Sequence, residues 1–146
     1  VVIRLSKIRI FIYTKNMKKV YVAGKFEQKD EVIKIQKQLI NSGYKISYDW
    51  TTHVGIKPYE QNQDQARLYS ENEINAIAES DIFIYLTQEY GTTNKMEFGA
   101  AVMKKALGND IQIFAMGEFN NKSPWYFNSY VERVNSIEEV YKNLGL

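Results

Sequence analysis

One carboxylate stands where a helix is predicted to begin, and it is the residue best placed to do chemistry. Glu97 lies in the segment 91–101, which reads GTTNKMEFGAA and passes from a loop into a helix. The helix dipole favours an ionised carboxylate near this end, and a carboxylate nucleophile must be ionised. Glu97 also follows Asn94 by three residues, the spacing of a capping box in which Asn94 caps the helix. Spacing alone therefore leaves two roles open, nucleophile and cap.

Other chemistries lack the residues they need. The chain has no cysteine, which excludes disulfides, thiolate zinc sites and cysteine nucleophiles. His53 is the single histidine, so a multi-histidine metal site is excluded, and a polar loop role is the more usual one for it. Gly24 carries neither a dinucleotide fingerprint nor a Walker sequence around it. Nicotinamide, flavin and ATP-driven reactions are therefore poorly supported.

Size and charge indicate a single soluble domain. The 146 residues are 45% hydrophobic and 14% aromatic, enough for one core. The net charge of +2 comes from interleaved acidic and basic residues, without the basic stripe of a nucleic-acid-binding face. No apolar run approaches the ~20 residues that span a bilayer. We expect a cytoplasmic protein that binds no nucleic acid or membrane, whereas a phosphate-bearing small ligand is compatible with this charge.

The first sixteen residues differ from the rest. Basic residues interrupt this segment: Arg4, Lys7 and Arg9. Met17 directly precedes an apolar strand and is a plausible natural start. We therefore predict that residues 1–16 are a dispensable N-terminal extension and that residues 17–146 form the domain. The alternative is an extra edge strand with alternating isoleucines: Ile8, Ile10 and Ile12.

From Met17 onward, apolar strands alternate with helices. Strands are expected at 20–23, 44–50, 81–86, 111–116 and 130–134. Helices are expected at 30–42, 63–79 and 95–107, and from Ser136 to the end. Inward positions on the first two helices are Val32, Ile35, Leu39, Ile40, Leu68, Ile74 and Ile77. The alternation predicts a flavodoxin/Rossmann-like α/β three-layer sandwich with a parallel sheet in the order 2-1-3-4-5.

This strand order predicts where a ligand binds. The first and third strands are neighbours whose connections leave in opposite directions, so a crevice opens at their carboxyl ends. The segments 24–26 and 89–97 are expected to line it. Gly24 either lets the chain turn off its strand or admits a ligand to the backbone. Asp81 begins its strand at the opposite end, so we assign it a structural role with nearby backbone N–H groups.

Two aromatic residues and two small ones adjoin this crevice. Phe26 and Trp50 follow strand ends and could sandwich a flat base, with core or loop packing as the alternative. Gly99 and Ala100 would let the Glu97 helix approach the sheet or a sugar closely.

These segments together resemble the nucleoside 2-deoxyribosyltransferase family. The resemblance rests on VYVAGKF at 20–26, Ser80-Asp81 before an apolar strand, Gly91-Thr92, and MEFGAA at 96–101. It covers most of the chain from Met17, and the superfamily includes deoxynucleoside monophosphate N-glycosidases. The segments 49–51 and 125–134 resemble a bacterial subgroup of the family.

The resemblance implies roles residue by residue. Glu97 matches the nucleophile, and Tyr21 matches a tyrosine that holds the nucleophile's carboxylate. Glu73 matches an aspartate that handles the base, although Glu is one methylene longer. An acid often found in the loop before the nucleophile is absent unless Glu89 substitutes for it. Asn128 matches a residue of a site shared between the subunits of a dimer.

The resulting expectation is an enzyme that needs no metal or organic cofactor. Glu97 attacks the anomeric carbon of a 2-deoxyribonucleoside, and the covalent sugar ester then passes to a second base with net retention. Expected substrate contacts are Gly24, Lys25, Phe26, Trp50, Gly91, Thr92, Gly99 and Asn128.

Two other functions stay open. The first is a nucleotide N-glycosidase that uses water as acceptor, with Lys25 and Thr92 holding a phosphate. The second is a nucleotide-binding or sensing module without turnover, in which Glu97 is only a cap. A homodimer or higher homo-oligomer is expected from the resemblance and from the aromatic segment 125–127.

Overall fold

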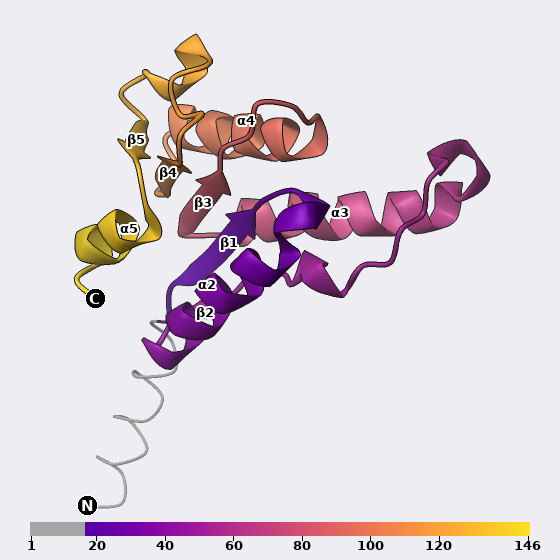
Figure 1. Ribbon diagram of the computed structural model, residues 1–146, viewed down its shortest axis with the longest axis horizontal. Helices are drawn as coiled ribbons and strands as arrows, with labels where there is room; N and C mark the ends of the chain where they lie inside the picture. The colour runs from indigo at the N-terminus through magenta and orange to yellow at the C-terminus, as the bar shows by residue number, and fades with distance from the viewer. Residues whose placement is uncertain (1–16) are drawn as a thin grey trace, which may run out of the picture.

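A computed structural model describes residues 17–146 of the chain (Figure 1). Residues 1–16 lie outside the described residues, so both interpretations of that segment stay predictions. None of the helices within the described part is long and apolar enough to cross a membrane.

Five parallel strands form one sheet in the order β2-β1-β3-β4-β5, which confirms the predicted fold class and strand order. The strands are β1 Lys19–Ala23, β2 Lys45–Ile46, β3 Ile82–Leu86, β4 Gln112–Met116 and β5 Val131–Val134. The α-helices are α2 Lys29–Asn41, α3 Gln63–Glu79, α4 Thr93–Ala106 and α5 Ile137–Leu144. Short 3₁₀ helices are η1 Phe26–Gln28, η2 Trp50–Thr52, η3 Tyr59–Gln61 and η4 Pro124–Tyr126.

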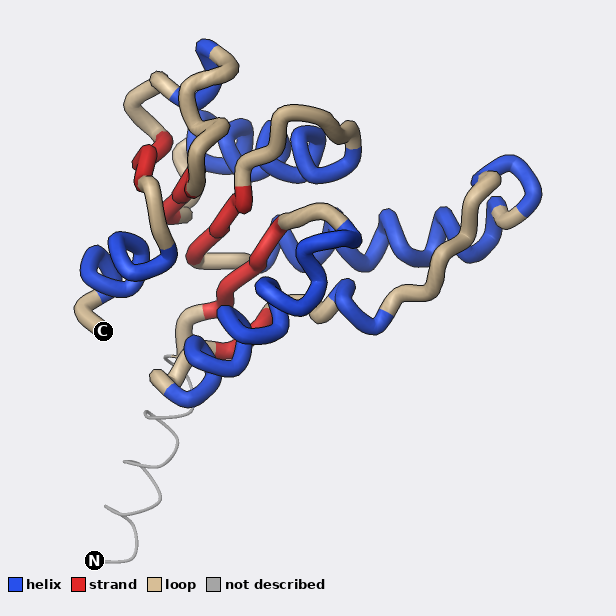
Figure 2. Tube along the Cα trace, viewed as in Figure 1, coloured by secondary structure: helices blue, strands red, loops and turns tan. Residues whose placement is uncertain are grey.

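The central strands β1, β3 and β4 are apolar because helices cover them (Figure 2). Alternate side chains of a strand point to opposite faces. Tyr21 of β1 points toward α4, which packs beside α3 on one face. Val20 and Val22 therefore point to the other face, where α2 packs against β1. The α3–α4 face of the sheet is consequently the one that meets Glu97.

Strand β2 is shorter than the predicted 44–50, because Asp49 redirects the chain. Its carboxylate accepts hydrogen bonds from the backbone N–H of Thr51 at 3.1 Å and from the Thr51 hydroxyl at 2.5 Å. Such local bonds compete with a strand ladder. Only Lys45 and Ile46 pair with β1, and η2 follows.

Three predicted inward positions are wrong. Leu68 and Ile74 of α3 are 52% and 61% exposed, and Ile40 near the end of α2 is 55% exposed. Figure 1 shows the beginning of α3 extending beyond the strands, so the first turns, which include Leu68, have no sheet to cover. Ile74 lies in the packed half of α3 but on its exposed side. The last turns of α3 do pack, and Ala76 and Ile77 are buried as the core requires.

The structural role predicted for Asp81 is present. Its carboxylate accepts the backbone N–H of Lys19 at 2.7 Å, at the edge of the sheet where β1 and β3 begin. The last helix also starts as expected. Ser136 caps it, and Glu138 and Glu139 occupy its first turn, where the helix dipole favours acids.

Candidate active site

A tyrosine of the central sheet contacts the carboxylate of α4. The Tyr21 hydroxyl donates a hydrogen bond to Oε1 of Glu97 at 2.5 Å. Tyr21 is fully buried, and its ring stacks on Phe83 of β3 with centroids 5.6 Å apart and planes 3° apart. Two neighbouring strands thus hold the ring, and the ring holds the Glu97 carboxylate.

The alternative role of Glu97 as a helix cap is not seen. α4 begins at Thr93, two residues earlier than predicted, and its N-cap is Thr92 without a side-chain cap hydrogen bond. Asn94 is therefore inside the first turn rather than before it. The Glu97 carboxylate points inward to Tyr21 instead of back along the helix.

Glu73 of α3 lies close enough to Tyr21 and Glu97 for its charge to act on both. Its side chain is only 15% exposed, and its charge raises the pKa of both Tyr21 and Glu97. The structure therefore brings together Glu97, Tyr21 and Glu73.

Both carboxyl groups hold protons more tightly than usual. Burial raises the pKa of Glu97 to about 8, against the opposing effect of the Tyr21 hydroxyl and with added repulsion from Glu73. Burial also raises the pKa of Glu73 to about 7. Two interacting carboxyls titrate as a pair, and this pair holds about one proton between pH 7 and 8. The pair can thus present one carboxylate and one carboxylic acid near neutral pH, but burial leaves the shared proton mainly on Glu97, so the form with Glu97 ionised and Glu73 protonated is the minor one.

The two predicted crevice loops meet at Gly91. Its φ of +135° suits only glycine. A Cβ on Gly91 would lie 2.9 Å from Oδ1 of Asn94 and 3.4 Å from Cε of Lys25. The loop after β1 therefore touches the loop before α4. Both polar atoms of the Asn94 amide are buried and have no hydrogen-bond partner among residues 17–146.

Other predicted residues lie differently. Trp50 is buried, and its indole N–H donates to the Val22 carbonyl at 2.7 Å, so the ring packs in the core and is not open to sandwich a base. A Cβ on Gly99 would meet nothing within 4 Å, so close approach to the sheet does not explain this glycine. A Cβ on Gly24 would press on Gln28 and Val32 at 3.2 Å, which assigns Gly24 to the packing of α2.

The remaining predicted residues lie at the surface or hold their own loop. Phe26 is 56% exposed, and Glu89 and Thr92 are exposed. The Asn128 amide donates to the Trp125 carbonyl at 2.6 Å and its Oδ1 accepts the Tyr130 N–H at 2.9 Å. Trp125 and Phe127 are exposed, and the predicted dimer stays a prediction.

The sequence reasoning missed the group beside Glu73. His53 lies with its Nδ1 3.6 Å from Oε1 of Glu73, and its Nε2 lies 2.7 Å from the Tyr48 hydroxyl. Tyr69 stacks on the imidazole with centroids 3.6 Å apart. One signal was available, because Tyr69 and Glu73 are four residues apart on a helix and so share a face.

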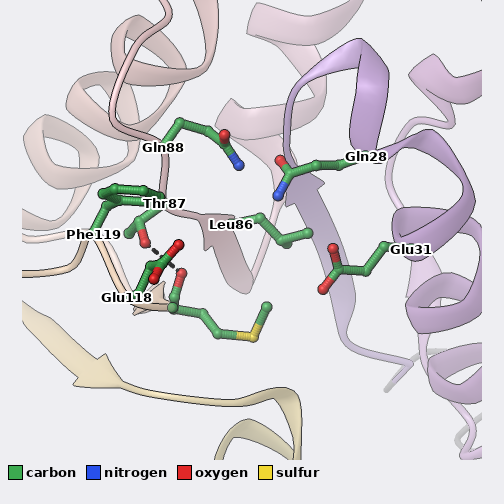
Figure 3. A pocket seen from close by; sticks show the side chains of 9 residues that line it. Gln28, Glu31, Leu86, Thr87, Gln88, Glu118 and Phe119 are labelled. Carbon is green, nitrogen blue, oxygen red and sulfur yellow. Dashed lines mark hydrogen bonds between the residues drawn. The ribbon is translucent and has the colours of Figure 1, made fainter.

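A separate hollow of about 280 Å³ lies at the carboxyl edge of the sheet (Figure 3). Residues that line it are Gln28, Glu31, Leu86, Thr87, Gln88, Met116, Gly117, Glu118 and Phe119. None of them is Glu97, Tyr21 or Glu73. Leu86 lies on the sheet face opposite Tyr85, which packs against Phe98 of α4. The paired carboxyls and the hollow thus occupy different faces of the sheet.

Within residues 17–146, no three acidic or histidine side chains are grouped so that they could hold a metal ion.

Neither a protein-family profile nor a curated protein sequence matches the chain. Its fold is similar to the solved structure of the Clostridium botulinum CMP N-glycosidase BcmB, with a TM-score of 0.51. The match covers 88% of this chain and 98% of that chain, at 19% sequence identity. At this identity the similarity shows a shared fold, and the fold is the one expected from the sequence.

Proposed function

We propose that this protein cleaves the N-glycosidic bond of a nucleoside 5′-monophosphate through a sugar ester on Glu97. The observation that carries the proposal is the hydrogen bond from Tyr21 to Glu97, with Glu73 near enough to raise the pKa of Glu97. A retaining glycosidase needs a nucleophile and an acid close together. The likeness in fold to a CMP N-glycosidase supports the same reaction class.

The first step would join the sugar to the protein. A Glu97 oxygen attacks the anomeric carbon, the carbon–nitrogen bond breaks, and Glu73 gives its proton to the departing base. The Tyr21 hydroxyl keeps one Glu97 oxygen engaged, which leaves the other free to attack. The positive charge that develops on the sugar ring favours the ionised form of Glu97 at that moment.

The second step would release the sugar. Glu73, now a carboxylate, takes a proton from water as the water oxygen attacks the anomeric carbon. The ester bond to Glu97 breaks and the carboxylate is restored. Two inversions at one carbon give net retention.

The start of α4 supports a phosphate on the substrate. Its first backbone N–H groups lack a side-chain cap, and free N–H groups at a helix N-terminus bind anions. The buried Asn94 amide, which has no partner within the described chain, lies against Gly91 in the same turn. Lys25 reaches Gly91 from the other loop and supplies a positive charge. This group favours a nucleotide over a nucleoside.

The acceptor distinguishes a hydrolase from the transferase expected from the sequence, since a free base in place of water would regenerate a nucleoside or nucleotide. The test incubates the protein with CMP, dCMP, cytidine and deoxycytidine, each with and without adenine, and separates the products. Release of cytosine from a nucleotide without adenine supports the hydrolase. Product that depends on adenine and contains it makes the protein a transferase. If calorimetry shows that wild type and Glu97→Gln bind the nucleotide equally and no product forms, the protein is instead a non-catalytic module.

A further inference from the structure

A group of side chains lies beside Glu73, and the mechanism above does not use it. It consists of His53, Tyr48, Tyr69 and Asn72. We propose that His53 is a positioning residue that aims the Glu73 carboxylate at the reacting base. The inference rests on the proposed function, because it assigns a partner to the acid of that reaction.

The imidazole is held on both edges and on one face. Its Nε2 lies 2.7 Å from the Tyr48 hydroxyl, and its Nδ1 lies 3.6 Å from Oε1 of Glu73. The Tyr69 ring covers one face, with centroids 3.6 Å apart and planes 5° apart. Only 12% of the His53 side chain is exposed. A loop residue with no partner would keep more freedom, so these contacts specify one orientation.

Tyr69 links the orientation of His53 to Glu73, the proposed acid. Tyr69 lies four residues before Glu73 on α3, so both side chains lie on one face of the helix. The Nδ1 of His53 lies 3.6 Å from Oε1 of Glu73, and its ring stacks on Tyr69. Movement of the loop after η2 is therefore coupled to the Glu73 side chain.

We assign His53 the tautomer that carries its proton on Nδ1, because the Tyr48 hydroxyl can donate to Nε2. The Asn72 amide donates to the Tyr48 oxygen at 3.4 Å, which leaves the Tyr48 hydroxyl proton for Nε2 of His53. Nδ1 then carries the imidazole proton and directs it at Glu73. Burial lowers the pKa of His53, with Asp49 acting in the opposite sense, so the imidazole is neutral near pH 7 and keeps this arrangement.

Burial raises the pKa of Glu73, and the titratable groups around this cluster come from three elements. Tyr21 comes from β1, Glu97 from α4, and Tyr48 and Asp49 from the segment after β2. None of these four carries a positive charge. We therefore assign the Nδ1–H of His53, 3.6 Å from Oε1 of Glu73, to stabilise the Glu73 carboxylate once Glu73 has given up its proton and the two groups close to hydrogen-bond distance.

Two variants separate positioning from packing. His53→Phe keeps an aromatic ring for Tyr69 and removes both nitrogens. His53→Asn places an amide N–H near the former Nδ1 and gives up the Tyr48 contact. Base release from CMP is measured from pH 5 to 10 for wild type and both variants, together with their thermal midpoints.

His53→Phe should lower kcat by about tenfold or more, a part of the 10²–10⁴ that an acid–base group supplies, while KM stays within about threefold. The limb of the pH profile that reports Glu73 should move to higher pH, since the carboxylate has lost a donor. In His53→Asn a clear part of the lost kcat should return. The limb of the pH profile that reports Glu73 should then lie closer to its wild-type position than in His53→Phe. Equal kcat losses in both variants that follow their thermal midpoints, or unchanged profiles, would overturn the proposal.

A measurement that needs no turnover tests the role of His53 independently of the proposed function. Carboxyl groups labelled with carbon-13 in glutamate report each titration by NMR, and Glu73→Gln identifies the Glu73 signal. His53→Phe should shift that titration to higher pH and His53→Asn should shift it less. A wild type that titrates in this way but releases no base would refute the proposed function alone. A Glu73 titration unchanged in His53→Phe would refute the positioning role alone.

Discussion

The Tyr21 hydroxyl and the Glu97 carboxylate lie 2.5 Å apart although 76 residues separate them in the chain. Tyr21 is fully buried in a central strand, so its ring cannot drift with a surface loop. Glu97 follows the loop that leaves the neighbouring strand β3. The pairing of β1 with β3 therefore sets the position of the proposed nucleophile.

Tyr21→Phe should impair the reaction and spare the fold. The substitution keeps the ring that stacks on Phe83 and removes only the hydroxyl. A hydrogen bond to a charged group contributes about 1.5–3 kcal/mol, so kcat should fall by roughly 10- to 100-fold. Tyr44→Phe is the matched control, because its hydroxyl lies 3.5 Å from the Leu144 carbonyl, away from the site. Equal activities of the two variants would contradict the role of Tyr21.

The rate of base release should follow a bell-shaped pH profile with limbs near pH 7 and pH 8. Burial raises the pKa of Glu73 to about 7 and that of Glu97 to about 8. Below both values the pair holds two protons and no nucleophile remains, and above both no acid remains. A profile of kcat/KM for CMP reports these values for the free enzyme. In Glu73→Gln the limb at high pH should disappear, and a bell that persists there would assign the acid to another residue.

Folding stability should fall as pH rises through the range in which Glu97 ionises. Its pKa is raised from the ordinary 4.5 to about 8 in the folded protein. The folded state therefore binds more protons than the unfolded state between these values, and the free energy of unfolding decreases with pH. Glu97→Gln stays neutral throughout, so it should exceed wild type at pH 9 by about 1–2 kcal/mol.

Urea unfolding at pH 5 and pH 9 measures this difference. Glu118→Gln is the control, since it removes an exposed carboxylate on the other face of the sheet. A Glu97→Gln protein that loses as much stability between the two pH values as wild type would show that Glu97 ionises without cost.

The sheet and the position of Glu97 were predictable because both depend on local patterns. Apolar runs such as 82–86 can only be buried strands between helices, and the strand order then places the loops after β1 and β3 together. The start of α4 was predicted at Lys95, within two residues of the observed Thr93. These features need no knowledge of which distant side chains meet.

Contacts across the fold were not predictable in this way. Trp50 follows a strand end, as expected of a crevice residue, yet the Val22 carbonyl draws its indole into the core. His53 was assigned to a loop, and only the packing of that loop on α3 brings it to Glu73. Asn94 has the spacing of a cap, but α4 starts before it. For Trp50 and His53 a tertiary partner outweighed the local preference.

Lys25→Gln should weaken the use of nucleotides and leave nucleosides little affected. Lys25 approaches Gly91 at the uncapped start of α4, where we place the phosphate. Loss of one charge-assisted contact costs about 1.5–3 kcal/mol, so the ratio of kcat/KM for CMP to that for cytidine should fall by roughly 10- to 100-fold. Lys37→Gln, an exposed change on α2, is the control. An unchanged ratio in Lys25→Gln would place the phosphate elsewhere.

Glu97→Gln should abolish turnover while the protein stays folded. The amide is close in size to the carboxylate and can still accept the Tyr21 hydroxyl, but it cannot form a stable ester with the sugar. Loss of a nucleophile removes most of the rate in enzymes that act through a covalent intermediate. The fold should survive, because Glu97 makes no cap contact and its neutral form is already favoured by burial.

The intermediate itself can be trapped. A 2-fluoro sugar analogue of the substrate slows both steps by destabilising positive charge on the ring, so the ester accumulates when the leaving base is good. Mass spectrometry of the digested protein should then find the added sugar on the peptide that contains Glu97, and should find none in Glu97→Gln. An adduct on the peptide with Glu73 or Glu89 would keep the reaction class and move the nucleophile. Near-normal turnover in Glu97→Gln would end the proposal, because no other carboxylate contacts Tyr21 within the described residues.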